Sequence, residues 1–254
     1  MKRLKKLLTV GIAAGMLATL PATASAQTDE RLPAPVTAQG TQTAETRPSM
    51  DSIKERAAKA IERRLDTLDE LTSRVTGSEH MTPRHKSTLL GEYASASFGL
   101  GVLGDRIEAA TTYEELRDLI PRIAADFRIY LVVVPKTRQV NASDRVGDAV
   151  VRLDEAADTT AEAIRRAEDA GYDMTDAKRW LVSARDDIAE ARNTGVPVAD
   201  NVIGLQASDW KEPAASELAQ GHRRLLNASV DLRKAKASLE QAKQAIEDAI
   251  GSDA

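Results

Sequence analysis

The chain has 254 residues and no cysteine, and 29% of its residues are charged while only 3% are aromatic. Its formal net charge of −4 argues against general nucleic-acid binding and against electrostatic docking on anionic lipid, because both need a basic face. Without cysteine the chain forms no disulfide, so packing has to stabilise the fold.

Residues 1–26 have the pattern of a secretory signal peptide. A basic start precedes an apolar run over residues 7–20, and the small residues Ala24, Ser25 and Ala26 form a cleavage site before Gln27. We expect export to a secreted or extracytoplasmic location at the cell envelope. Cleavage would leave a more acidic chain with no membrane span. The alternative is a retained N-terminal anchor, although the apolar run is short for a span of about 20 residues.

Residues 27–50 are predicted to be a disordered spacer, and residues 51–254 a helical domain. The spacer is rich in Thr, Pro, Ala and Gln and has no periodic apolar positions. Such a segment cannot bury enough apolar area to offset the loss of chain entropy on folding. From about Ser52 onward, apolar residues recur at spacings of three and four, which is the pattern of amphipathic helices.

Two helices are predicted before residue 110. The first begins near Ser52, with Glu55 three residues later as a capping box, and it ends at Gly77. The second begins with Thr82 as its cap and Pro83 at its first position. The apolar faces are expected to comprise Ile61, Leu65, Leu68, Thr72 and Val75 in the first helix, and Leu89, Tyr93, Leu100, Leu103 and Ile107 in the second.

The densest apolar stretch of the chain follows a third predicted helix, which begins at residues 111–115 and is kinked by Pro121. This stretch, residues 126–136 (DFRIYLVVVPK), is expected to form the buried centre, with Phe127 and Tyr130 in the main core. Its second half is mostly β-branched and so resembles a buried strand. The chain offers no second strand to pair with it, so we favour a helix that ends or bends before Pro135.

Three further helices are predicted in the C-terminal half. Asn141 or Ser143 caps the first, the second begins at Thr175 and has a kink rather than a stop at Pro197, and the last covers residues 214–250. In the last helix, leucine and alanine alternate with a seven-residue period, which favours near-antiparallel, coiled-coil-like packing against the helix from Thr175. The positions of this pattern are Leu225, Ala228, Leu232, Ala235, Leu239, Ala242, Ile246 and Ala249. The predicted fold class is therefore all-α, with long antiparallel helices in an elongated bundle.

One motif resembles a nucleotide-binding signature. Gly99, Gly101 and Gly104 spell the G-x-G-x-x-G pattern of dinucleotide-binding folds. That pattern functions between a strand and a helix within a βαβ unit, and here it lies inside a helical pattern with no βαβ alternation. We therefore interpret these glycines as a close contact between helices.

No catalytic, cofactor-binding or metal-ligating residues are predicted. His80 and His85 are five residues apart, a spacing that does not place two imidazoles on one helix face, and both are expected to be exposed in a turn. His222 lies far from them in the sequence. The adjacent acidic residues of the helices are interpreted as solvated faces rather than catalytic pairs: Glu168 with Asp169, and Asp186 with Asp187.

Four other residues also receive structural interpretations. Asn141 and Asn227 each begin an N-x-S pattern that matches a glycosylation acceptor, but the first is placed at a helix cap and the second within a helix. Trp180 and Trp210 are expected to lie in the core rather than to act as exposed binding anchors, because the chain has so few other aromatic residues.

The chain resembles a family of uncharacterised secreted, all-helical proteins of high-GC Gram-positive bacteria. The resemblance is carried by the signal peptide and Thr-rich spacer and by four segments. These are residues 61–65 (IERRL), 111–116 (TTYEEL), 126–136 (DFRIYLVVVPK) and 207–210 (ASDW). The resemblance implies a secreted helical protein, and it provides no activity and no catalytic residues to transfer.

These observations favour an exported, non-enzymatic helical protein with a structural or protein-interaction role at the cell envelope. Its expected partner is another envelope protein or a second copy of the chain, and no cofactor or nucleic acid is expected. One alternative is a small-molecule or metal carrier that uses a cleft around Tyr130. Another is an extracytoplasmic, chaperone-like binder. A continuous exposed apolar strip would favour a surface for a partner or a client protein.

Overall fold

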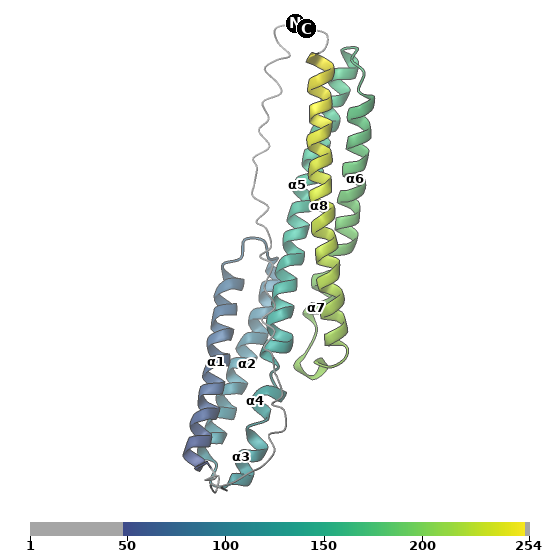
Figure 1. The fold of residues 1–254 in the computed structure, drawn as a ribbon. Coiled ribbons are helices and arrows are strands. Elements are labelled where there is room, and N and C mark those ends of the chain that lie inside the picture. Colours follow the sequence, from purple (N-terminus) through teal and green to yellow (C-terminus); the bar gives the residue numbers. More distant parts are fainter. Residues whose placement is uncertain (1–47, 252–254) are drawn as a thin grey trace, which may run out of the picture. The chain divides into compact units, whose positions relative to one another are not determined.

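The computed structural model describes residues 48–251 of the chain (Figure 1). Within this range every regular element is a helix, which confirms the predicted all-α fold class. No helix among these residues is both long and apolar enough to cross a membrane. The predicted signal peptide and residues 27–47 of the predicted spacer lie outside the described residues.

Helices α1 (Met50–Thr76) and α2 (Pro83–Ala109) form an antiparallel hairpin (Figure 1). Helix α1 begins slightly earlier than predicted because Ser49 caps it. The Ser49 hydroxyl accepts a hydrogen bond from the Ser52 N–H at 3.2 Å, which satisfies one of the free N–H groups of the first turn. The predicted end of α1 is confirmed, since Gly77 is its C-cap residue.

The buried face of the hairpin follows the sequence pattern closely. Helix α2 begins as predicted, with the Thr82 hydroxyl as cap and Pro83 in the first turn, and all five of its predicted apolar positions are buried. In α1 one position differs from the prediction. Thr72 is exposed and Leu71 is buried in its place, because Leu71 lies three residues after Leu68 on the same helix face.

Two short helices, α3 (Tyr113–Leu119) and α4 (Arg122–Ala125), follow the hairpin. Helix α3 begins with a capping box, in which the Thr112 hydroxyl accepts from the Glu115 N–H and the Glu115 carboxylate accepts from the Thr112 N–H. The predicted kink at Pro121 is a full break between the two helices. Proline removes a backbone donor from the helical ladder, which accounts for the position of the break.

The central apolar stretch is helical from Ile129 onward, and the helix continues through Pro135, so the alternative that it ends before this residue is wrong. A π-helix (Ile129–Val133) leads directly into α5 (Val134–Asp169), and Pro135 lies in the first turn of α5. Proline fits there because first-turn N–H groups need no partner within the helix. The predicted caps at Asn141 and Ser143 are therefore wrong, since both residues lie well inside α5.

The prediction that Tyr130 lies in the main core is also wrong. Arg128 adopts a left-handed conformation, with φ of 43°, and the π-helix begins directly after it. The five-residue turn directs Tyr130 and Leu131 outward, so that Tyr130 is 50% exposed, while Phe127 is half-buried. The residues of the π-helix that enter the core are Ile129, Val132 and Val133.

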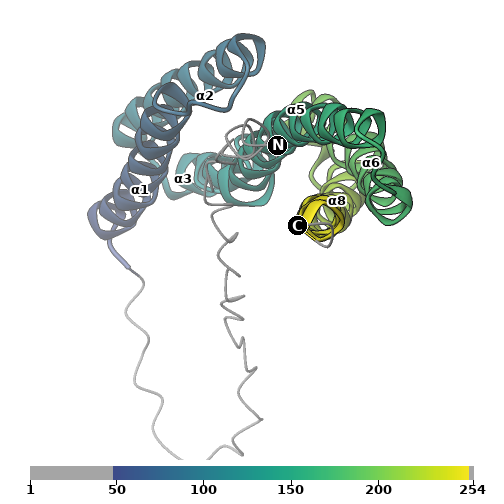
Figure 2. The same cartoon turned by 90° about the horizontal axis from the view of Figure 1, so that it is seen from above.

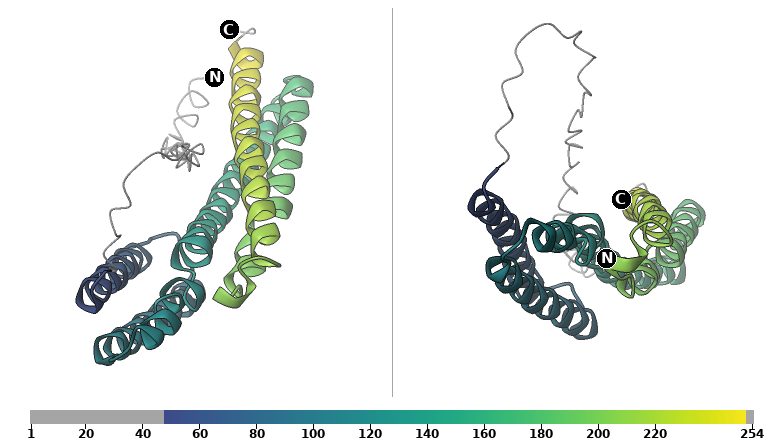
Figure 3. Two further views of the ribbon diagram at one scale, coloured as in Figure 1. Left: turned by 60° about the horizontal axis from the view of Figure 1, so that its bottom comes forward. Right: turned by 90° about the horizontal axis from the view of Figure 1, so that it is seen from below.

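The C-terminal half is a three-helix bundle of α5, α6 (Thr175–Gly195) and α8 (Ala214–Gly251) (Figures 1, 2 and 3). The short α7 (Val198–Ile203) begins directly after Pro197, whereas α6 ends at Gly195, so the prediction of a kink rather than a stop at this proline is wrong. Helices α6 and α8 pack against each other along their length, which confirms the predicted pairing. Alanines line this contact with no side-chain surface exposed: Ala184, Ala191, Ala228, Ala235 and Ala242.

Candidate functional site

A row of polar side chains on α5 contacts the α1–α2 hairpin, and we name it the polar junction. Its α5 members recur at spacings of four, three and four residues, so they share one face of the helix. The pairs are Thr137 Oγ1 with Tyr93 Oη (2.5 Å), Asn141 Oδ1 with Ser78 Oγ (2.9 Å), Asp144 Oδ2 with His85 Nδ1 (2.8 Å), and Asp148 Oδ2 with His80 Nδ1 (2.7 Å).

His85 is the most enclosed histidine of the junction, contrary to the prediction that it is exposed. The residue is only 7% exposed, and its Nε2 lies 3.6 Å from the carboxylate of Asp200 on α7. Asp144 also accepts a hydrogen bond from the Thr82 N–H at 3.0 Å. His85 therefore connects α2 with both α5 and α7. Sequence reasoning missed this role because its partners are remote in the chain, with Asp144 lying 59 residues away.

A fully buried lysine, Lys136, lies directly before Thr137 of the junction. The Lys136 ammonium donates to Glu92 Oε2 at 2.5 Å and to the Leu205 carbonyl at 2.7 Å. A buried ammonium is stable only when a counter-charge and hydrogen bonds replace its hydration. The lysine thereby connects α2, α5 and the segment that follows α7, and the sequence gives no local indication of it.

Burial raises the pKa of Tyr93 to about 12, so its phenol is protonated at neutral pH. The Thr137 hydroxyl donates to the Val133 carbonyl at 2.8 Å, which leaves its oxygen free to accept the phenol proton. This chain of hydrogen bonds runs from α2 through α5 to the π-helix. All polar groups in it are satisfied by one another, which suits a structural joint.

Ser143 also forms hydrogen bonds between α5 and another part of the chain, at the C-terminal end of α6. Its hydroxyl lies 2.8 Å from both the Gly195 and Val196 carbonyls, and its oxygen accepts from the Ala199 N–H at 3.1 Å. These backbone groups have lost their helical partners at the Pro197 break, so the serine replaces them. This role at the break between α6 and α7 differs from the predicted cap at the start of a helix.

A cleft with an apolar floor lies between α2 and α4, and we name it the Phe98 cleft. It has a volume of about 240 Å³. Phe98 is 76% exposed and Val102, one turn later on α2, is 43% exposed. The half-buried ring of Phe127 completes the floor. Both phenylalanines of the chain therefore line this one cleft.

The rim of the Phe98 cleft carries three charged side chains. Arg122 and Asp126 form an ion pair across one helical turn, with 2.8 Å between Nε and Oδ2. The third, Arg106, makes no hydrogen bond or ion pair with any residue in the described part of the chain. One guanidinium beside the apolar floor is thus available to a binding partner.

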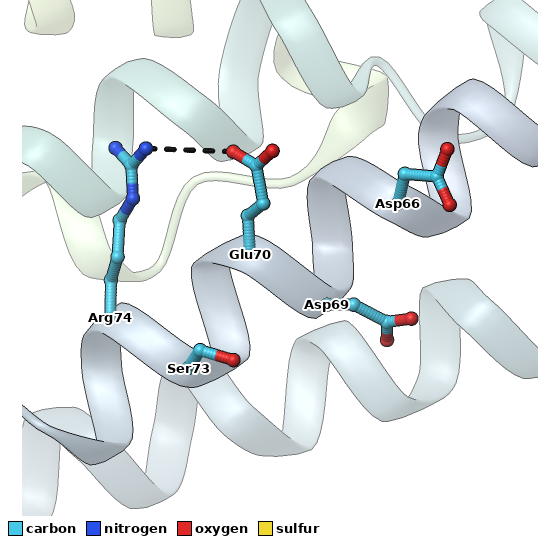
Figure 4. Close-up of a pocket in the computed structure, with 5 residues that line it drawn as sticks. All are labelled: Asp66, Asp69, Glu70, Ser73 and Arg74. Atoms are coloured by element: carbon cyan, nitrogen blue, oxygen red, sulfur yellow. Dashed lines mark hydrogen bonds and ion pairs between the residues drawn. The ribbon is translucent and has the colours of Figure 1, made fainter.

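A second depression, of about 450 Å³, lies over α1 and is lined by polar side chains of that helix (Figure 4). Asp66, Asp69 and Ser73 border it together with Glu70 and Arg74, whose closest charged atoms are 3.5 Å apart. All of these residues are polar or charged and come from one helix. The arrangement is that of a solvated helix face, so we do not regard it as a site.

The glycine motif lies within a helix, as the sequence indicates, but the expected close contact between helices is not present at all three glycines. Gly99, Gly101 and Gly104 lie within α2, with no strand before them in the described range. A Cβ on Gly99 would lie 2.8 Å from the Phe127 ring, whereas a Cβ on Gly101 would meet nothing within 4 Å. The close approach at Gly99 is therefore made by a side chain following α4 and not by a neighbouring helix backbone.

The two tryptophans differ in their surroundings. Trp210 is half-buried against the core, as expected, and the Arg128 guanidinium lies 4.1 Å from its ring centroid. Trp180 is also half-buried but does not pack against the core, so its predicted core position is wrong. The acidic pair at Asp186 and Asp187 lies on α6, where partial burial raises the pKa of Asp187 against the opposing effect of Lys234.

No group of three or more metal-ligating side chains within residues 48–251 is arranged to hold an ion. Comparison of the chain with protein-family models, with curated proteins and with solved structures finds no match in any of the three. Of the two hollows described above, the Phe98 cleft is the one lined both by exposed apolar side chains and by a charged side chain without an ion-pair partner among residues 48–251.

Proposed function

We propose that the chain is an exported, non-enzymatic helical protein that binds another protein at the cell envelope through the Phe98 cleft. The exposure of Phe98 carries this proposal. Full burial of such a side chain stabilises a contact by about 1.5–3 kcal/mol relative to leaving it in water. Aromatic residues are enriched at protein interfaces for this reason.

The surroundings of Phe98 distinguish it from other exposed apolar residues. Single exposed apolar side chains are common and need no explanation. Val151 and Val182, for example, are each more than half exposed and border neither of the two hollows described above. Phe98 instead continues into Val102 and Phe127 around a hollow. Such a hollow accepts a side chain of a partner, which is how anchor residues of interfaces bind.

The size of the cleft favours a protein partner over a small-molecule cargo. Sites that bind drug-sized ligands usually have a volume of about 300–1,000 Å³. The Phe98 cleft is smaller, with a volume of about 240 Å³. The carrier alternative placed its cleft around Tyr130. The Tyr130 hydroxyl donates a hydrogen bond to the Arg63 carbonyl at 3.2 Å, and the Arg64 guanidinium lies 5.4 Å from the centroid of the Tyr130 ring. The Tyr130 side chain is therefore already in contact with α1.

Export is the first part of the proposal to test. The basic start, the apolar run and the small residues at 24–26 support it. Intact-mass measurement of the protein recovered outside the cytoplasm should give a chain that begins at Gln27. Recovery of the full-length chain in the cytoplasmic fraction would contradict export.

Partner binding is tested by affinity purification from envelope extracts with three tagged forms: wild type, Phe98→Ser and Val182→Ser. The two substituted side chains are both exposed and lie on different helices, so neither change should affect folding. We expect a protein that co-purifies with the wild type and with Val182→Ser but is lost with Phe98→Ser. Equal recovery with all three forms would show that the Phe98 cleft is not the binding surface.

A further inference from the structure

We propose that the Phe98 cleft recognises an acidic, apolar segment of its partner, in which a large apolar side chain enters the cleft and a neighbouring carboxylate pairs with Arg106. This inference rests on the proposed function, since it assumes that the cleft binds a protein. It adds the chemistry by which the partner would be selected.

Charge complementarity is the first argument. Of the three charged side chains at the rim, Arg122 and Asp126 neutralise each other, and Arg106 remains unpaired among the described residues. The cleft is therefore locally positive, whereas the whole chain is acidic with a net charge of −4. An acidic segment is repelled by most of the surface and attracted at this place, which directs it to the cleft.

The helical geometry of α2 is the second argument. Phe98, Val102 and Arg106 are each four residues apart, so they follow one another along the same face of α2. Four residues rise by about 6 Å, which is also the separation of residues one turn apart on a partner helix. A partner helix with an apolar residue and a carboxylate three or four positions apart matches Val102 and Arg106.

The chemistry of the contact favours a carboxylate over other acceptors. A guanidinium donates two parallel hydrogen bonds to a carboxylate, and the apolar floor beside Arg106 keeps part of the contact away from water. An uncharged partner would bury the apolar floor but would leave Arg106 without a counter-charge. The unpaired arginine thus acts as a specificity element beside the Phe98 anchor.

The test selects binders without assuming a sequence. A phage-displayed library of random 12-residue peptides is selected on the purified wild-type protein and depleted on Phe98→Ser. Enriched peptides are synthesised with a fluorescent label, and their binding is measured by anisotropy. We expect the enriched peptides to combine Leu, Ile or Phe with Asp or Glu at a fixed spacing, and to bind more weakly as salt is raised.

Arg106→Gln is the decisive variant, and Arg117→Gln on α3 is its matched control, because both arginines are exposed and Arg117 does not line the cleft. We expect Arg106→Gln to weaken binding of an enriched peptide by about tenfold or more, the effect of one charge-assisted contact. Arg117→Gln should change the affinity by less than about twofold.

The two proposals fail in different ways. The acidic-segment inference is overturned if the peptides that need Phe98 are uncharged or basic. It is also overturned if an enriched peptide binds Arg106→Gln with the same affinity as the wild type. Both results leave the interaction role of the cleft intact. If no peptide depends on Phe98, and Phe98→Ser instead converts a dimer to a monomer in sedimentation analysis, the occupant is a second copy of the chain. That result also overturns the inference.

Discussion

The ring of Phe127 lies against the backbone of Gly99, so closely that a Cβ at position 99 would be 2.8 Å from the ring. This contact joins the segment after α4 to α2 and forms the floor of the Phe98 cleft. It also makes the two nearby glycines of α2 inequivalent, because a Cβ on Gly101 would meet nothing within 4 Å.

Substitution of these glycines by alanine separates helix propensity from packing. Gly101→Ala should stabilise the fold by up to about 1 kcal/mol, because alanine favours the helix at an open position. Gly99→Ala gains the same propensity but has to displace the Phe127 ring, so it should be less stable than Gly101→Ala. Urea denaturation of the two variants measures the difference. Equal stabilisation would show that the Phe127 ring does not rest on Gly99.

The seam between α6 and α8 predicts a second contrast. Ala235 is fully buried in this seam, and Ala237 is exposed on the same helix. Ala235→Leu adds three carbons to a filled interface, and overpacking of this kind typically costs about 1–3 kcal/mol. Ala237→Leu should be nearly neutral, since alanine and leucine have similar helix propensities. Thermal unfolding of both variants decides the matter, and an unchanged melting temperature for Ala235→Leu would contradict close packing.

Removal of the buried ammonium should be costly. Lys136→Met keeps most of the side-chain volume but leaves Glu92 and the Leu205 carbonyl without their shared donor. Breaking a buried ion pair in this way typically costs about 3–5 kcal/mol. Lys243 is paired with Glu247 at the surface, so Lys243→Met should cost less than about 1 kcal/mol. Denaturant titration of the two variants tests the prediction, and similar losses would show that Lys136 adds little.

Tyr93 predicts how stability depends on alkaline pH. Its pKa is about 12 in the folded chain because burial disfavours the phenolate, against an ordinary value of 10.0. The stabilising contribution of the protonated phenol is therefore complete below pH 10 and is lost as the pH rises through about 12. Tyr93→Phe lacks this titration. The wild type should lose its stability advantage over Tyr93→Phe between about pH 10 and about pH 12, as measured by urea denaturation. A constant difference would refute the assigned burial effect.

The helices could be predicted from the sequence because their signals are local. Thr82 with Pro83 and the proline at 197 are signals read within one turn of the chain, and the structure has a helix boundary at each, although the sequence predicts a kink rather than a stop at Pro197. The π-helix has no such signal. The left-handed conformation of Arg128 interrupts the helix, so the residues after it do not continue the apolar face of the residues before it. For that reason Tyr130 faces outward although the apolar run predicts burial.

The candidate site could be predicted only in part. Phe98 does not belong to the apolar periodicity of α2, and an aromatic residue off the buried face was the available signal of an exposed anchor. The rest of the cleft depends on Phe127 and Arg122, which lie in a different helical segment and reach α2 only in the folded chain. The polar junction was hidden for the same reason, since the partners of His80 and His85 are 68 and 59 residues away.

The most direct test of the account is photo-crosslinking from position 98 in cells that export the protein. A photoreactive benzoyl-phenylalanine replaces Phe98 in one form and Val182 in another, since both side chains are exposed. We expect irradiation to link position 98 to a specific protein, seen as a discrete adduct by gel and identified by mass spectrometry, with no such adduct from position 182. The same products from both positions, or no adduct from position 98, would contradict a binding role for the Phe98 cleft.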